Sequence, residues 1–128
     1  MTYFNTFEVE KAVEDYFTDN WDGEIRYANT KKRPDSAEWI VVEVAPVFTD
    51  PGISGCIEVL HIIHITCNSR TKVSSAILAD RATKFLCGAK LAGSTVGAWR
   101  PVAQGTVFNG LHFRKMSFPL SVTTRCCF

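Results

Sequence analysis

The pattern of apolar and polar residues near the start of the chain predicts an amphipathic helix. Apolar side chains recur at intervals of three and four residues, which places them on one face of a helix. These positions are Val9, Ala12, Val13, Tyr16 and Phe17. Asn5 is a suitable N-cap, and Glu8 three residues later can complete a capping box. The solvated face and the exit of this helix, which ends near Trp21, then hold Asp15, Asp19 and Asp22.

A second helical period begins at Lys72. Apolar residues from Val73 to Leu86 again recur at helical spacing, with charged residues between them. Thr71 or Ser69 can cap the start of this helix, and Gly88 can end it.

Five segments are predicted strands, because they are rich in β-branched and aromatic residues or follow a strong turn signal, Asn109-Gly110. They are Glu24–Ala28, Trp39–Phe48, Cys56–Cys67, Trp99–Val107 and Leu111–Thr123. Pro46 indicates an edge or bulge position in the second. Both faces of the third are largely apolar, which is typical of a central strand in a sheet covered on at least one side. The predicted loops between elements are Asn29–Glu38, Thr49–Gly55 and Gly88–Ala98.

This order of elements, a helix, three strands, a helix and two strands, predicts a single α+β domain over residues 1–128. The sheet is expected to be mostly antiparallel, with the two helices packed on one of its faces. The length of the chain is sufficient for one hydrophobic core without staples.

The charge balance argues against a general polyanion binder. Fourteen Lys and Arg residues stand against thirteen Asp and Glu residues, a formal net charge of +1. No global field would therefore attract nucleic acid or an anionic membrane. No apolar run approaches the roughly 20 residues of a membrane span. Five cysteines without framework spacing, and no signal peptide, favour reduced thiols in a protein made in the cytoplasm.

Two possible metal motifs fail on spacing. An EF-hand loop centred on Gly23 would place Thr18 first and Asn29 last, where a carboxylate and a bidentate glutamate are needed. His61 and His64 form an H-x-x-H pair with Cys67 after them, but residues three apart on a strand point to opposite faces. We therefore expect no metal and no cofactor.

No catalytic signature is visible. The segment "GSTVG" lacks the order of a nucleophile elbow, and the chain has no phosphate-binding loop of the Walker type. Cys126-Cys127 has the spacing of incidental thiols and not of a C-x-x-C redox pair. A nucleophile formed by a cysteine and a histidine stays open as an alternative, since such residues meet in space and not in sequence.

The basic run Lys31-Lys32-Arg33 lies in the first predicted loop. It has two interpretations, a solvated loop or a patch that faces a polyanion or an acidic neighbour.

Part of the chain resembles a family of virus proteins. The segment "VEDYFTDNWDGEIRYANTKKRPDSAEWIVVEV", Val13 to Val44, resembles the start of the lambda-type tail terminator proteins of long-tailed bacteriophages. That family has an amphipathic helix ending in "YF…NW", an "I-x-Y-x-N" strand and a "W-[IV]-x-V" strand. The segment "ILADRATKFL", Ile77 to Leu86, resembles its second helix.

The resemblance implies a structural protein of the virion and not an enzyme. Family members form a hexameric ring on the completed tail tube, end its polymerisation and present the surface that joins the head. The implied partners are further copies of the chain, the tail tube protein and a head-tail connector or stopper protein, while DNA passes through the channel without specific binding. The implied location is the tail or neck of the virion, after synthesis in the host cytoplasm.

The same resemblance guides the choice of site residues. Loops are suitable for contacts between subunits or with partners, and the candidates there are Lys31, Lys32, Arg33, Asp50 and Ile53. The expected structural anchors are Tyr16, Phe17, Trp21, Tyr27 and Trp39. Two alternatives stay open, namely a stopper or other neck protein and, from a different class, a small cytoplasmic enzyme that uses Cys or His chemistry.

Overall fold

The computed structural model describes residues 6–27, 38–51, 56–106 and 110–125, of which residues 6, 47–51, 56–58 and 123–125 are described as backbone alone. The two helices are α1 (Thr6–Asn20) and α2 (Lys72–Leu86). The strands are β1 (Ile25–Tyr27), β2 (Trp39–Pro51), β3 (Cys56–Ser69), β4 (Lys90–Leu91), β5 (Ser94–Thr95), β6 (Arg100–Thr106) and β7 (His112–Arg125).

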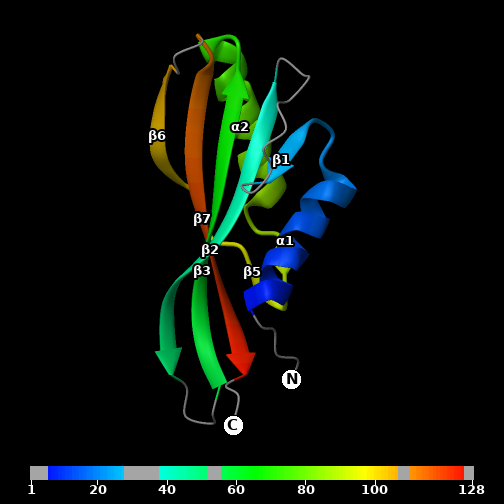
Figure 1. Ribbon diagram of the computed structural model, residues 1–128, viewed down its shortest axis with the longest axis vertical. Helices are drawn as coiled ribbons and strands as arrows, with labels where there is room; N and C mark the ends of the chain where they lie inside the picture. The colour runs from blue at the N-terminus through cyan, green and yellow to red at the C-terminus, as the bar shows by residue number, and fades with distance from the viewer. Residues whose placement is uncertain (1–5, 28–37, 52–55, 107–109, 126–128) are drawn as a thin grey trace.

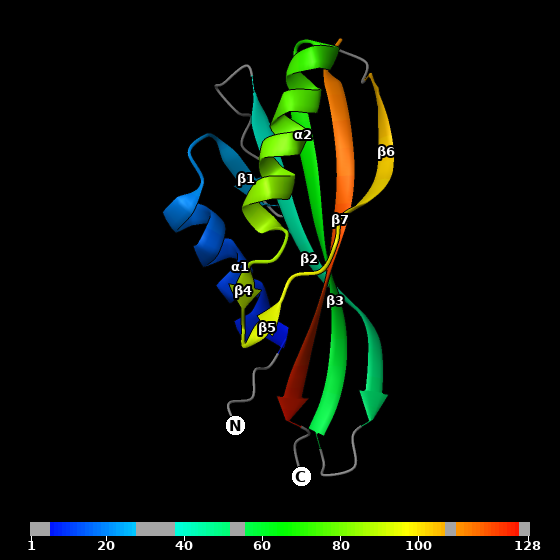
Figure 2. The same ribbon diagram turned by 180° about the vertical axis from the view of Figure 1, so that it is seen from behind.

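One five-stranded sheet, in the order β1-β2-β3-β7-β6, organises the molecule (Figure 1). β1 pairs in parallel with β2, and every other pair in this sheet is antiparallel. Both helices lie on one side of it, the near side in Figure 2, and leave the opposite side without a covering helix. The predicted α+β class, with helices on one face of a mostly antiparallel sheet, is confirmed.

The core lies between the helices and the central strands. β3 is third of five in the sheet, as its two apolar faces predict, and its alternate residues Ile63, Ile65 and Cys67 are fully buried toward the helices. The intervening Ile62 is only half-buried and faces the other side, which we call the bare face. Because side chains alternate along a strand, the odd-numbered residues of this part of β3 belong to the core and the even-numbered ones to the bare face.

Aromatic side chains join the two helices to each other. Phe85 of α2 stacks on Tyr16 with ring centroids 4.6 Å apart and contacts Phe17 at 5.0 Å and Trp21 at 5.1 Å. The Tyr16 hydroxyl also donates a 2.7 Å hydrogen bond to the carbonyl oxygen of Phe85. Among the described residues, neither helix has the length and apolar character that a membrane span requires.

The ends of α2 follow the predicted signals. The side chain of Thr71, the N-cap, accepts a hydrogen bond from the Ser74 N–H at 3.1 Å. Just beyond the helix, Gly88 has a φ of +81°, a left-handed conformation in which a side chain would be strained. Asn5, the predicted N-cap of the first helix, lies outside the described residues.

The segment Gly88–Ala98 is not simply the loop that its weak periodicity predicts. It contains β4 and β5, joined by a two-residue turn at Ala92 and Gly93, whose φ values are 51° and 77°. The buried Leu91 and Val96 fix this small hairpin against the core. Strands of two residues are too short for a sequence period, so only tertiary packing reveals them.

The ends of β2, β3 and β7 form an arm, and β2 and β7 are longer there than their patterns predict. β2 continues to Pro51 past a register shift between Pro46 and Phe48, which is the irregularity that Pro46 indicates. The predicted loop at Thr49–Gly55 therefore begins as strand. We define the β-arm as the backbone of 48–51, 56–60 and 121–125; it projects beyond both helices at the lower end of the views in Figures 1 and 2.

Candidate interaction surfaces

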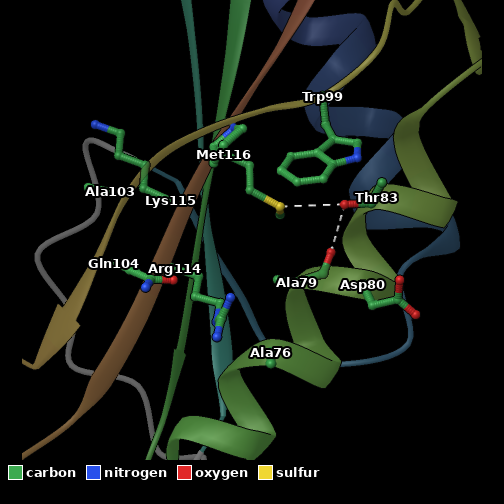
Figure 3. Close-up of a pocket in the computed structure, with 11 residues that line it drawn as sticks. Ala76, Ala79, Asp80, Thr83, Trp99, Ala103, Gln104, Arg114, Lys115 and Met116 are labelled. Atoms are coloured by element: carbon green, nitrogen blue, oxygen red, sulfur yellow. Dashed lines mark hydrogen bonds between the residues drawn. The ribbon is translucent and has the colours of Figure 1, made fainter.

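A groove runs between α2 and the edge of the sheet formed by β6 and β7 (Figure 3). The hollow between α2 and the segment from Trp99 to Gln104 has a volume of about 240 Å³. Two further hollows, of about 390 and 220 Å³, continue it along the start of α2, and Arg114 lines all three. We call this continuous feature the α2–β6 groove.

The floor of the groove is closed by satisfied side chains. The Thr83 hydroxyl donates to the carbonyl oxygen of Ala79 at 2.9 Å, and the Thr83 hydroxyl oxygen lies 3.4 Å from the sulfur of Met116. Asp80 forms an exposed ion pair with Lys84, with 3.2 Å between the charged atoms. These described residues provide no nucleophile that is paired with a base, which is what an acyl- or phosphoryl-transfer site requires.

Apolar side chains border the α2–β6 groove on both sides. Val73 and Ile77 on α2 are 69% and 59% exposed, and Trp99, just before β6, is 45% exposed. Val102 of β6, which does not line the groove, is 50% exposed. In the part of the chain that the structure describes, the remaining large apolar side chain with such exposure is Phe7 on α1, at 70%. Exposed apolar side chains gathered along a groove are typical of surfaces that bind another macromolecule.

Charge is strongly divided along the chain, although the net charge is near zero. Residues 1–58 hold twelve Asp or Glu and five Lys or Arg, whereas residues 59–128 hold one, Asp80, and nine Lys or Arg. In space, α1 carries five of these twelve acids, and Asp15 and Asp19 among them are exposed, while Lys72 and Arg114 line the groove. Composition alone hides this division, which counting charges by halves of the chain would have found.

Negative charge is concentrated enough on α1 to affect titration. The pKa of Glu14 is raised, first by partial burial and then by the carboxylates of Glu10 and Asp15. A cation that approached this face would offset the repulsion between the carboxylates and favour the ionised form of Glu14.

The predicted contact residues in loops are only partly placed by the structure. Lys31, Lys32, Arg33 and Ile53 lie outside the described residues. Asp50 belongs to β2 in the β-arm, where its backbone pairs with that of Glu58.

Four of the five predicted anchors lie at the junction of α1 with the sheet. Phe17 is fully buried, and Tyr16, Trp21 and Tyr27 are partly buried against the core. The Tyr27 hydroxyl donates to the carbonyl oxygen of Glu14 at 2.9 Å and also contacts the Thr18 hydroxyl.

The two predicted tryptophan anchors have different surroundings. The indole of Trp21 lies under the guanidinium of Arg81, 4.9 Å from the ring centre, and Arg81 also donates to the carbonyl oxygen of Asp22 at 3.0 Å. Trp39 is half-buried, and strand alternation with the buried Ile40 directs it to the bare face instead of the helix side.

The histidines and cysteines of β3 do not converge. His61 is fully buried toward the core, and its Nδ1–H donates to the Val59 carbonyl oxygen at 3.2 Å, while His64 is half-buried on the bare face. Burial raises the pKa of the Cys67 thiol to about 12, which keeps it protonated and a poor nucleophile. Over the described ranges, no three His, Cys, Asp or Glu side chains gather as metal ligands.

The fold is expected to lose stability as the pH falls below 6.5. Burial lowers the pKa of His61 and of His64 from that ordinary value, and Lys115 lowers the pKa of His64 further. Below pH 6.5 these two imidazoles take up protons more readily in the unfolded chain than in the folded one. The free energy of unfolding therefore falls as the pH drops from 6.5 toward their lower folded-state pKa values. Urea unfolding at about pH 7.5 and about pH 5.5 measures the difference.

His61→Leu should reduce this dependence on pH, because it removes one of the two groups. His112→Asn is the matched control, since it removes a histidine that contacts the Thr106 hydroxyl at an exposed position. An unchanged pH dependence in His61→Leu would show that burial of this imidazole is not its cause.

Comparison with known proteins gives a likeness at the level of the fold. No protein-family model matches the chain, and a search of curated proteins gives no match. Among solved structures, a chain of the particle titled "Virion of native gene transfer agent (GTA) particle" matches with a TM-score of 0.68. The match covers 95% of this chain and 99% of that chain at 13% sequence identity, so the two share their fold from end to end.

Proposed function

We propose that this protein is a structural component of a phage-like virion that closes the tail tube as a hexameric ring. In this role it ends polymerisation of the tube and forms the surface to which the head joins. The observation that carries the proposal is the fold shared over 95% of this chain with a chain of a virion particle. The tail-terminator resemblance of Val13 to Val44 supports the more specific role.

The surfaces of the molecule are suitable for assembly. The β-arm extends beyond the helices, and a small sheet without a covering layer gains stability when another surface packs on it. The α2–β6 groove provides a second contact region, with exposed Val73, Ile77 and Trp99 beside it. A ring requires two different patches on each subunit, and these features provide more than one candidate.

The charge is also compatible with a channel that conducts DNA. A ring at the end of a tail must let DNA pass without holding it, and each phosphate contact adds a salt-dependent increment of affinity. A formal net charge of +1 per chain limits the summed attraction for DNA. We therefore expect no tight or sequence-specific DNA binding.

Electron microscopy and mass measurement test the proposed function together. We expect the purified protein, or the protein on tail tubes, to form a six-fold ring, and a labelled copy to locate at the head-proximal end of the tail. A location between this ring and the head would identify a stopper or other neck protein instead. A monomer that turns over a substrate would contradict the structural role.

The basic run is expected to contribute to contacts with neighbouring subunits or an acidic partner. Reversing Lys31, Lys32 and Arg33 to glutamate should leave the monomer folded while it weakens ring formation or attachment to the tail. Particles assembled with this variant should show overlong tails or tails detached from heads. Normal particles would refute this role, and loss of a tight, sequence-specific DNA interaction would refute the structural function itself.

A further inference from the structure

We propose that the outer face of α1 in one copy docks into the α2–β6 groove of the next copy, so that subunits join head to tail. The proposal rests on the proposed function, because it supplies the heterologous interface that a ring needs. It assigns the partner of the groove as a second copy of this chain.

The positions of the two surfaces favour contact between copies over contact within one copy. α1 and β6 lie at opposite sides of the molecule in both Figure 1 and Figure 2. Neither surface can reach the other in the same subunit, whereas a second copy placed alongside brings them together. Repetition of the same contact produces a closed ring when the rotation between subunits closes.

The apolar parts of the two surfaces are complementary. Phe7 is 70% exposed in the first turn of α1. It lies off the apolar face by which this helix packs on the sheet, so the core of the monomer does not need an aromatic residue there. The groove offers exposed Ile77 on one side and exposed Trp99 on the other. An aromatic side chain inserted between apolar walls is typical of the energetic centre of an interface, so Phe7 is the expected anchor.

The charges around these apolar groups differ in net sign, although Lys11 is an exposed base on α1 and Asp80, paired with Lys84, also lines the groove. Asp15 and Asp19 are exposed on α1, whereas Lys72 is exposed at the groove and Arg114 lies half-buried along it. Association of the two faces would place carboxylates near these bases, which steers the approach and fixes which surfaces meet. Partial burial is the first cause of the raised pKa of Glu14, and the carboxylates of Glu10 and Asp15 raise it further; a cation nearby would offset that second contribution.

The edge of the sheet beside the groove is poorly suited to the other common mode of association, addition of a strand. β6 is an edge strand that contains Pro101, and its register with β7 shifts between Pro101 and Ala103. Proline and irregular pairing both hinder pairing with another strand. Docking of side chains into the groove is therefore favoured over extension of the sheet.

A charge swap tests the contact by sedimentation of the full chain at low salt. The acid-reversed variant carries Asp15→Lys and Asp19→Lys, and the base-reversed variant carries Lys72→Glu and Arg114→Glu. Each alone should weaken self-association about ten-fold or more, because like charges would then meet. The chain with all four changes, and an equimolar mixture of the two variants, should both recover association. Circular dichroism checks folding, and Arg114→Gln replaces Arg114→Glu if the latter unfolds.

The outcomes separate this proposal from the proposed function. If rings form and both reversed variants still form them as the wild type does, the contact is wrong and the ring stands. Failure of the four-fold variant and of the mixture to recover association would also overturn the contact. A wild type that stays monomeric at low salt and forms no ring on tail tubes would remove the proposed function together with it.

Discussion

Replacing Phe17 with alanine is expected to lower the free energy of unfolding by about 3–5 kcal/mol, the usual cost of truncating a buried aromatic residue. Phe17 is fully buried, lies 5.0 Å from the ring centre of Phe85 and forms part of the core cluster. The variant would leave a cavity at the point where both helices meet, and neighbouring rings can fill it only in part. Denaturant unfolding, or a fall in the melting temperature, measures the loss.

Phe7→Ala is the matched control in the same helix. Its side chain is 70% exposed, so the same change should alter the free energy of unfolding by no more than about 0.5 kcal/mol. By the proposed contact, however, it should weaken association between subunits. Equal destabilisation by the two alanine variants would mean that the face of α1 that packs on the sheet is assigned wrongly.

Ile63→Lys is expected to prevent stable folding. Ile63 is fully buried in β3, with Val44 and Phe118 beside it on the neighbouring strands. A lysine there would have to bury an unpaired ammonium group or lose its proton, and the expected cost exceeds about 4 kcal/mol. Expression of soluble protein and its melting curve measure the effect.

The neighbouring change Ile62→Lys separates burial from strand propensity. Ile62 is half-buried on the bare face, where a lysine can extend its ammonium group into water, so a cost of about 1 kcal/mol is expected. The two variants differ by one position on the same strand. If Ile62→Lys unfolded the protein as completely as Ile63→Lys, the bare face would have to be covered within the monomer.

Much of the fold follows from periodicity in the sequence. The helical spacing before Trp21 and after Thr71 locates both helices, since each must bury one apolar face. The segment from Cys56 to Cys67 is apolar on both faces, and this identifies it as the central strand. By contrast, the β4–β5 hairpin and the extension of β2 to Pro51 have no such signal, because pairing with neighbouring strands and packing against the core stabilise them.

The candidate surface was harder to predict. Prediction concentrated on loops, including Lys31 to Arg33 and Ile53, because loops tolerate change and often bind partners. The α2–β6 groove instead combines residues far apart in sequence, such as Val73, Trp99 and Arg114, on regular elements. Residues so far apart form no local motif from which the groove could be predicted. The division of charge between the two halves of the chain, however, can be read from the sequence.

The sequence by itself determined the α+β class, the order of the main elements and the central position of β3, because local propensity and the period of apolar residues act over a few neighbouring positions. The structure decided between the two N-cap candidates of α2, in favour of Thr71 over Ser69. Only the tertiary structure decided that Trp39 faces the bare side, that α1 and β6 lie at opposite sides, and that a groove separates α2 from β6. These properties depend on how strands pair and which faces the helices cover, and the free energy of that arrangement comes from contacts between residues distant in the chain.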